Sequence, residues 1–371
     1  MKVAVTVLTF CVAALLALGM VMLYSSSMTQ AGAHVLIMQL IWCALGLGLC
    51  VTAAWADYRW LKKINWPLLA FAVLLLVAVL FAGRRINGAR RWFHFHGYQF
   101  QPSELAKLAL VIALAWYGEH FQRQMPTWKR GILVPGLFIG LVLGLIFVEP
   151  DRGTTILLAA VSGAVLLVAG VRWKYFVPPI LLGIAGLGFS IWRDPMRMKR
   201  IFSWLYLEEH KTGTGYQAYQ AMLALGSGGW TGLGLGNGRQ KQGFVPEHYT
   251  DFILSIIGEE LGLIATLLVV AAFVAIILCG LCIARQARDP FGMLLATGIT
   301  FLIGLQAFIN IGVVTSALPN KGLPLPFISY GGSNLLAMLA GVGLLLSIAR
   351  QTRAPENIPV GPVETGEART A

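Results

Sequence analysis

Four groups of charged residues in this sequence could perform acid–base chemistry or bind an anion. They are the segment Glu149-Pro-Asp-Arg152, the single residue Asp251, the arginine-rich stretch Gly83–Trp92, and the pair Glu104 and Lys107. A positioned carboxylate can serve as a general base, and the planar fork of an arginine pairs with two phosphate oxygens at once. These residue types together favour chemistry on a phosphorylated substrate.

The elements that must position these charges are almost entirely apolar. Of 371 residues, 57% are apolar and 12% are charged, whereas a soluble domain has roughly 45–50% and about 25%. The apolar residues form long runs without a polar face, so the sequence predicts a membrane protein with many spans. The net charge of +12 is attributed mainly to membrane topology, and no nucleic-acid partner is expected.

Apolar runs of about 20 residues, the length that crosses a bilayer, predict an all-α fold with ten transmembrane helices. The first run is interpreted as a retained span rather than a cleaved signal peptide. Residues 1–353 are expected to form one membrane domain, and 354–371 a disordered cytoplasmic tail. The predicted spans are 3–24, 35–55, 66–83, 103–118, 131–149, 154–170, 175–192, 252–283, 291–313 and 333–349.

The distribution of Lys and Arg predicts that both chain termini are cytoplasmic. With that orientation the inside segments hold fourteen of these residues and the short outside loops hold six, as the positive-inside rule requires. Four of the six lie in the loop 83–92, namely Arg84, Arg85, Arg90 and Arg91. Two explanations are open for them: non-specific attraction to anionic headgroups, or a docking site for a ligand that bears phosphate.

Charges beside the spans also allow more than one interpretation. Glu104 and Lys107 can meet on one helix face, either as a structural ion pair or as part of a ligand site. Asp151 can pair with Arg152 in a local turn, or it can anchor another loop or a ligand.

Asp251 is predicted to lie at or next to the start of the eighth helix. There it can cap the helix, since a carboxylate is stabilised at a helix N-terminus, or it can do chemistry. With Ser255 and Glu259 it recurs every four residues, which predicts a polar side that faces a cavity.

The long segment 193–251 is predicted to lie outside the membrane, between spans seven and eight. Its first part, 193–215, is interpreted as an amphipathic piece on the membrane surface. The glycine-dense stretch 226–243 either is a flexible loop or brings backbone N–H groups close to an anion. A second, proline-rich loop, 318–334, carries one cation, Lys321.

The predicted outer face suits an amphiphile that has an anionic headgroup and a lipid tail. Both an enzyme that acts on such a lipid and a transporter that moves it fit these features. No Ser–His–Asp or Cys–His arrangement and no metal-ligand spacing is evident. The five cysteines all lie in apolar runs, so no disulfide framework is expected.

The motifs resemble those of the SEDS family (shape, elongation, division and sporulation), the RodA/FtsW group of bacterial peptidoglycan glycosyltransferases. Arg152 and Tyr249 depart from the family pattern. The loop around Lys321 is similar to the division branch, FtsW. The motifs are Asn87-Gly-Ala-Arg-Arg-Trp92, Gln101-Pro-Ser-Glu104, Glu149-Pro-Asp151, Gly226-Ser-Gly-Gly229, Pro246-Glu-His-Tyr-Thr-Asp251, Glu259-Glu-Leu-Gly262, Leu318-Pro-Asn-Lys-Gly-Leu-Pro-Leu-Pro326 and Ile328-Ser-Tyr-Gly-Gly-Ser333.

The resemblance implies an inverting enzyme that polymerises lipid II at the outer face of the bacterial cytoplasmic membrane, at the division septum. Asp251 matches the family's essential aspartate and is assigned as the general base. Arg91, Lys321 and Lys107 become candidates for contacts to pyrophosphate, and Trp92 for stacking on a sugar. The full predicted substrate-binding set is Arg90, Arg91, Trp92, Glu104, Lys107, Asp151, Glu247, Lys321 and Ser329.

The resemblance also implies partners and a possible cofactor. The expected partners are lipid II and glycan linked to undecaprenyl pyrophosphate, a class B penicillin-binding protein, and divisome or elongation-complex proteins. It allows a divalent cation, Mg²⁺ or Mn²⁺, and no organic cofactor. The competing hypothesis is a lipid II flippase, although no inverted repeat with paired broken helices is visible.

Overall fold

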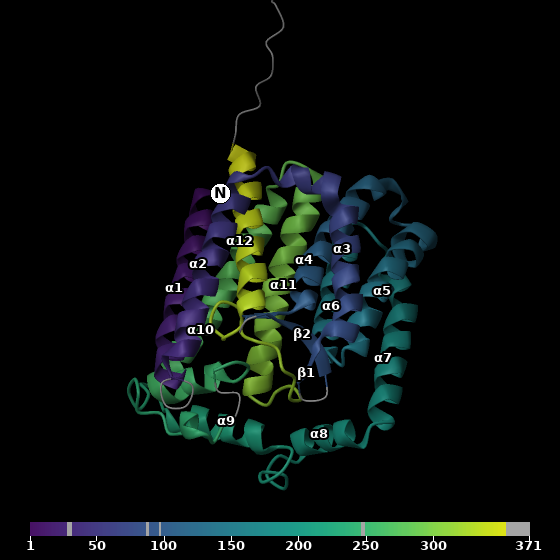
Figure 1. Ribbon diagram of the computed structural model, residues 1–371. Helices are drawn as coiled ribbons and strands as arrows, with labels where there is room; N and C mark the ends of the chain where they lie inside the picture. Colours follow the sequence, from purple (N-terminus) through teal and green to yellow (C-terminus); the bar gives the residue numbers. More distant parts are fainter. Residues whose placement is uncertain (28–31, 87–88, 96–97, 246–248, 354–371) are drawn as a thin grey trace, which may run out of the picture.

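A bundle of ten long helices makes up most of the chain (Figure 1). The computed structural model describes residues 1–27, 32–86, 89–95, 98–245 and 249–353. Each of the ten apolar runs predicted from the sequence forms one of these helices. They are α1 (Lys2–Ser27), α2 (Ala33–Trp55), α3 (Leu61–Ala82), α4 (Pro102–His120), α5 (Val134–Val148), α6 (Arg152–Val168), α7 (Val177–Trp192), α10 (Ile253–Arg285), α11 (Pro290–Val314) and α12 (Gly332–Arg353).

Eight of the helical segments are long and apolar enough to cross a membrane. Of the other two, α6 is apolar but has only 17 residues. Helix α4 carries Glu104 and Lys107 in its first two turns, and most of its residues are buried. It therefore packs inside the bundle, where neighbouring helices rather than lipid surround it.

Helix α7 differs from the rest because none of its residues is buried. Figure 1 shows it beside the bundle. Because its sequence is apolar all round, its exposed surface matches lipid rather than water.

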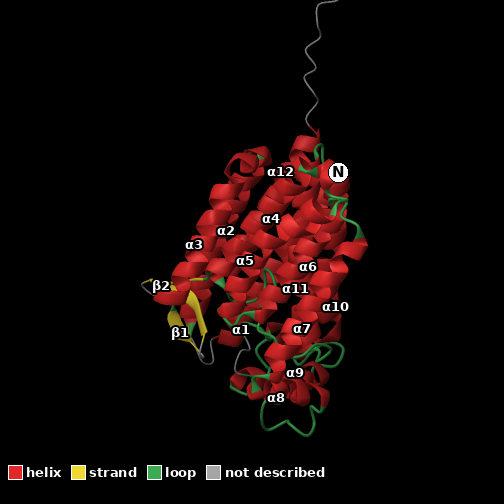
Figure 2. Ribbon diagram, turned by 90° about the vertical axis from the view of Figure 1, so that its right-hand side faces the viewer, coloured by secondary structure: helices red, strands yellow, loops and turns green. Residues whose placement is uncertain are grey.

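The two ends of the bundle differ in what covers them. The N-terminus and the end of α12 lie together at one end, and α8 (Pro195–Leu205), α9 (Tyr216–Ser227) and a small sheet lie at the other (Figures 1 and 2). We call the second end the sheet end. The start of α1 and the end of α12 thus lie on the same side of the bundle.

The sheet was not predicted from the sequence, which indicated only a short loop at 83–92. Its strands are β1 (Arg84–Ile86), β2 (Ala89–Phe95) and β3 (Tyr98–Phe100), all antiparallel in the order β1-β2-β3. The dipeptide Asn87-Gly88, which separates the first two strands in the sequence, is a strong hairpin signal that would have predicted the pairing of β1 with β2.

Helix α10 spans 33 residues but is broken at Gly262, whose φ is 79°. A Cβ at this position would lie 2.4 Å from the backbone nitrogen of Gly232, so only glycine fits here. The break explains why the predicted eighth span was too long. The part before Gly262 belongs to the sheet end, and the part after it continues through the bundle.

Candidate functional site

The connection between α11 and α12, residues 315–331, contains most of the predicted proline-rich loop 318–334, and we use that name for it from here on. It carries part of the candidate site. Two buried amides on α11 hold its backbone. Gln306 Nε2 donates to the carbonyl oxygen of Pro324 at 2.9 Å, and Asn310 Nδ2 donates to that of Leu323 at 2.7 Å. A buried loop needs such donors because its carbonyl groups have no water to bind.

Asp251 lies against this loop. Asn310 Nδ2 also donates to the Asp251 carbonyl oxygen at 2.7 Å. Ser329 Oγ donates to the carbonyl oxygen of Thr250 at 2.5 Å and accepts from the backbone nitrogen of Leu325 at 2.8 Å. Together these hydrogen bonds fix the position of the backbone at Asp251.

The carboxylate of Asp251 faces the residue that follows Lys321. A Cβ added to Gly322 would lie 2.7 Å from Asp251 Oδ2, so the glycine makes room for the carboxylate. Asp251 is not at the predicted cap position, because the N-cap residue of α10 is Phe252 and its cap has no side-chain hydrogen bond. The Asp251 side chain is partly exposed, which leaves it accessible for proton transfer.

Glu104 and Lys107 meet as the i, i+3 spacing predicted. Lys107 Nζ lies 2.7 Å from Glu104 Oε2 and donates to Gln306 Oε1 at 2.9 Å. Asn334 Nδ2 donates to Glu104 Oε2 at 3.1 Å. The Lys107 side chain is 0% exposed, so the pair ties α4 to α11 and α12 beneath the loop. Substrate contact by these two residues stays a prediction.

Asp151 caps α6. Its carboxylate accepts from the Thr154 backbone nitrogen at 3.1 Å and from Thr154 Oγ1 at 2.9 Å. The predicted turn pair of Asp151 with Arg152 is not among the ion pairs of the described residues. Arg152 instead donates to Ser190 Oγ on α7 at 2.7 Å.

Arg90 and Arg91 point to different places, as neighbours on a strand do. Arg90 donates to the carbonyl oxygens of Leu80 and Phe81 at the end of α3. Arg91 donates to the carbonyl oxygen of Glu149 at 2.9 Å and to that of Pro150 at 2.6 Å.

Only Arg91 of this pair therefore reaches the connection between α5 and α6. Its guanidinium carbon lies 5.9 Å from the centre of the Trp92 ring. The indole and the guanidinium thus form one surface beside this connection.

Glu149 is fully buried beside Asp151. Neither of its carboxylate oxygens has a hydrogen-bond partner among the described residues. Burial is the largest cause that raises the pKa of Glu149 to about 8, and the negative charge of Asp151 is the second; the positive charge of Arg91 opposes the shift. The side chain therefore holds its proton at neutral pH. A neutral carboxyl group avoids the cost of an unpaired charge in this buried position.

Two members of the predicted polar side of α10, Ser255 and Glu259, are buried, whereas Asp251 is partly exposed. Glu259 accepts from the backbone nitrogens of Arg239 at 2.8 Å and of Gln240 at 3.2 Å. Ser255 Oγ donates to the carbonyl oxygen of Phe252 within its own helix. The prediction of a cavity was wrong for Glu259, because the glycine-dense stretch covers its carboxylate with backbone N–H groups.

Glu260, next to Glu259, accepts from Gly236 N at 3.1 Å and forms an ion pair of 2.7 Å with Lys241. The glycine-dense stretch thus brings backbone N–H groups to an anion, as one of its two interpretations required. The anions are the protein's own carboxylates.

The structure brings most of the predicted site residues to the sheet end, in two groups. Asp251, Lys321 and Ser329 lie on or against the proline-rich loop, and Arg91 with Trp92 lies beside the connection that holds Asp151. A Cβ at Gly153 would lie 3.1 Å from Leu323 Cγ, so the two groups adjoin. Glu247 lies outside the described residues.

Uncharged amides in apolar helices were missed as positioning residues. Besides Gln306 and Asn310, Gln39 on α2 donates to the carbonyl oxygen of Ser329 at 3.2 Å. The signal was present, since an amide inside an apolar run is costly unless it has a partner.

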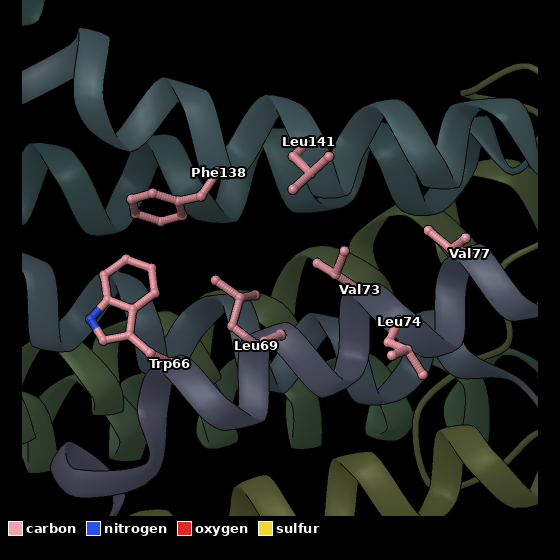
Figure 3. Close-up of a pocket in the computed structure, with 8 residues that line it drawn as sticks. Trp66, Leu69, Val73, Leu74, Val77, Phe138 and Leu141 are labelled. Carbon is pink, nitrogen blue, oxygen red and sulfur yellow. The ribbon is translucent and has the colours of Figure 1, made fainter.

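No group of three or more His, Cys, Asp and Glu side chains is arranged to hold a metal ion in the described part of the chain. An apolar groove lies elsewhere, between α3 and α5 (Figure 3), with a volume of about 490 Å³. Trp66, Val73 and Phe138 are typical of its apolar lining, which carries no ionisable side chain. The groove offers a surface for lipid and no acid–base chemistry.

Fold and site together define a polytopic helical membrane protein that brings most of its candidate site residues to one end of the bundle. A family model described as "Cell cycle protein", FtsW/RodA/SpoVE, matches residues 5–354. The chain belongs to this family.

Named relatives and solved structures agree with this assignment. The chain is 40% identical to the "Probable peptidoglycan glycosyltransferase FtsW" of Geobacter metallireducens, over 92% of this chain and 93% of the relative. It is 38% identical to the protein of the same name from Coxiella burnetii, over 93% and 96%.

Among solved structures, one described as "Structural coordination of polymerization and crosslinking by a peptidoglycan synthase complex" matches with a TM-score of 0.79. It is 29% identical, over 94% of this chain and 98% of that one. The rod shape determining protein RodA of Thermus thermophilus matches with a TM-score of 0.71 at 30% identity, over 94% and 97%.

Proposed function

We propose that this protein is an inverting peptidoglycan glycosyltransferase that polymerises lipid II at the outer face of the bacterial inner membrane. The observation that carries the proposal is the position of Asp251. It is a partly exposed carboxylate held against Gly322 of the loop, the residue that directly follows the cation Lys321. The names of the FtsW relatives support the same reaction.

In the proposed reaction, the Asp251 carboxylate takes the proton from the 4-hydroxyl group of the incoming lipid II. The hydroxyl oxygen attacks the anomeric carbon of the growing glycan, and the bond from that carbon to pyrophosphate breaks. Undecaprenyl pyrophosphate leaves with the electron pair. A base at the acceptor and a cation at the leaving group are the two requirements of this step.

Lys321 is the cation that we assign to the leaving group. Its side chain forms no hydrogen bond or ion pair with any residue that the structure describes, although it is partly buried. Burial, together with the charge of Arg152, lowers the pKa of Lys321, while Asp151 raises it. An ammonium group in this setting gains from an anionic ligand.

The proposal includes the membrane topology and the biological setting. All ten long helices span the membrane, both termini are cytoplasmic, and the sheet end with residues 193–251 is outside. The enzyme acts at the division septum with a class B penicillin-binding protein that cross-links the new glycan. The structural neighbour described as a peptidoglycan synthase complex supports such a partner.

A divalent cation remains part of the proposal as an accessory to the leaving group. Mg²⁺ is commonly held by one or two carboxylates plus substrate phosphates, so the lack of a three-ligand cluster among the described side chains is compatible with it. Asp251, which lies against Gly322 next to Lys321, is a carboxylate close to the proposed pyrophosphate position. Removal of divalent ions with a chelator tests the idea.

The experiment is polymerisation of purified lipid II by the purified protein, alone and with a cognate class B penicillin-binding protein. We expect glycan strands that a muramidase digests. Transport of lipid II across vesicles in the absence of any glycan product would reject the enzyme and support the flippase.

A further inference from the structure

Four cations from three elements gather at the sheet end beside the proline-rich loop. Arg152 begins α6, Arg197 and Arg200 lie on α8, and Lys321 lies on the loop. We call these four residues the basic cluster. None of the three arginines is in the predicted substrate-binding set.

Two of the guanidinium groups share one neutral acceptor. Arg152 Nη2 donates to Ser190 Oγ at 2.7 Å, and Arg197 Nη1 donates to the same oxygen at 3.1 Å. Asp194 pairs with Arg197 Nε at 2.8 Å. Arg152 Nε is buried and has no acceptor among the described residues. A guanidinium with an unpaired buried N–H needs an acceptor that the described protein does not provide.

Lys321 and Arg200 extend the cluster toward the loop. Besides burial, the charges of Arg152, Arg200 and Arg197 lower the pKa of Lys321, against the opposing effect of Asp151. The Arg200 side chain is exposed and makes no ion pair with the described part of the chain. Trp204 Nε1, further along α8, donates to the carbonyl oxygen of Ser316 at 2.8 Å. This bond fixes α8 to the loop.

Like charges held this close repel one another unless an anion lies between them. Planar guanidinium forks and an ammonium group are the side chains that pair best with phosphate oxygens. Ser190 lies in the last turns of the apolar helix α7, so the cluster is at the level where lipid headgroups begin. These observations point to a phosphorylated lipid as the ligand.

We propose that Arg152, Arg197, Arg200 and Lys321 form a binding site for the phosphate or pyrophosphate headgroup of a lipid. The site adjoins Asp251 through two successive loop residues, since Gly322 abuts Asp251 and Leu323 abuts Gly153 of α6. The choice of the leaving undecaprenyl pyrophosphate as the ligand rests on the proposed function. The choice of a phosphate-bearing lipid rests on the cluster alone.

The test measures binding separately from turnover. The full-length protein is placed in nanodiscs of phosphatidylcholine and titrated with undecaprenyl pyrophosphate, and in a second arm with phosphatidylglycerol. Arg152→Leu and Arg200→Leu are compared with Lys199→Leu, which removes an exposed charge on the same helix. The loss of one charge-assisted hydrogen bond should weaken binding at least about tenfold for Arg152→Leu.

The two arms identify the source of the phosphate. Weaker binding of undecaprenyl pyrophosphate only, with Lys199→Leu unchanged, supports a substrate site. An equal loss for phosphatidylglycerol supports a site for anionic membrane lipids. Unchanged binding of both lipids by Arg152→Leu and Arg200→Leu overturns the proposal.

Folding and the proposed function are controlled independently. Arg200→Leu removes an exposed side chain, so it tests the site even if Arg152→Leu does not fold. Arg152→Lys keeps the charge without the fork and should bind at an intermediate level. A wild-type protein that binds undecaprenyl pyrophosphate through these arginines but forms no glycan would reject the proposed function and leave this site standing.

Discussion

The buried pair of Glu104 and Lys107 gives a prediction whose size follows from the structure. Lys107 Nζ has two acceptors, Glu104 Oε2 at 2.7 Å and Gln306 Oε1 at 2.9 Å. Glu104→Gln would leave a buried ammonium group with neutral partners only. Breaking a buried pair from one side costs about 3–5 kcal/mol, so we expect the free energy of unfolding to fall by that amount. Lys107→Met should cost about as much.

The double variant Glu104→Gln/Lys107→Met separates charge from packing. It buries no unpaired charge, so it should be destabilised by less than either single variant, and the coupling free energy should be at least about 3 kcal/mol. Unfolding in mixed micelles with increasing SDS, followed by tryptophan fluorescence, measures these values. The control is Glu119→Gln, which breaks the partly exposed pair with Lys62 and should cost about 1 kcal/mol or less.

Two results would refute this reasoning. One is a double variant whose loss equals the sum of the two single losses, because the side chains would then not be coupled. The other is a loss for Glu119→Gln as large as that for Glu104→Gln. A stable double variant that nevertheless fails to bind lipid II would assign the pair to the substrate site, as the sequence allowed.

Three further predictions concern Glu149, Gly262 and Arg91. Glu149 keeps its proton to about pH 8 in the folded protein, so its contribution to the free energy of unfolding is complete below about pH 4.5 and decreases by about 1.4 kcal/mol per pH unit as the pH rises to about 8. Glu149→Gln should remove this pH dependence from melting curves, and an unchanged pH dependence would contradict the raised pKa. Gly262→Ala should lower the melting temperature sharply, since the residue has a φ of 79° and no room for a Cβ. Gly144→Ala on α5, where a Cβ has open space, should not lower it. Equal melting temperatures for the two variants would contradict this prediction. Arg91→Glu should weaken lipid II binding at least about tenfold relative to Arg85→Glu on the exposed strand β1, and equal losses would favour non-specific headgroup attraction.

The helices could be predicted from the sequence because bilayer thickness sets the length of an apolar run. The ends of the ten helices fall within about five residues of the predicted limits, and the largest difference is the start of α3 at Leu61, which was predicted at 66. The sheet was missed because 83–92 was considered as a source of charge and not as a hairpin. The alternation of Arg90 and Arg91 between two surfaces follows from the strand and could not be seen without it.

The candidate site could be predicted from the sequence where the chemistry of a single residue was enough to identify it. Asp251 and Lys321 stand out because each is a single charge at the edge of an apolar or stiff segment. What the sequence could not give was the partner of each polar group. Glu259 pointed to a cavity by its spacing, but a stretch 20 residues away covers it with backbone N–H groups. Arg152 and Arg197 both donate to the Ser190 hydroxyl, from which they are separated in the sequence by 38 and seven residues. This shared contact exists only in the folded chain.

The measurement that tests the central claim most directly is glycan synthesis by purified Asp251→Asn protein, with lipid II binding measured on the same preparation. Asparagine keeps the shape of aspartate and removes the base. We predict that lipid II still binds and that polymerisation slows at least about 10²-fold, the lower end of the contribution of general base catalysis. Glycan synthesis at close to the wild-type rate would contradict the assignment of Asp251 as the base and, with it, the account of this site.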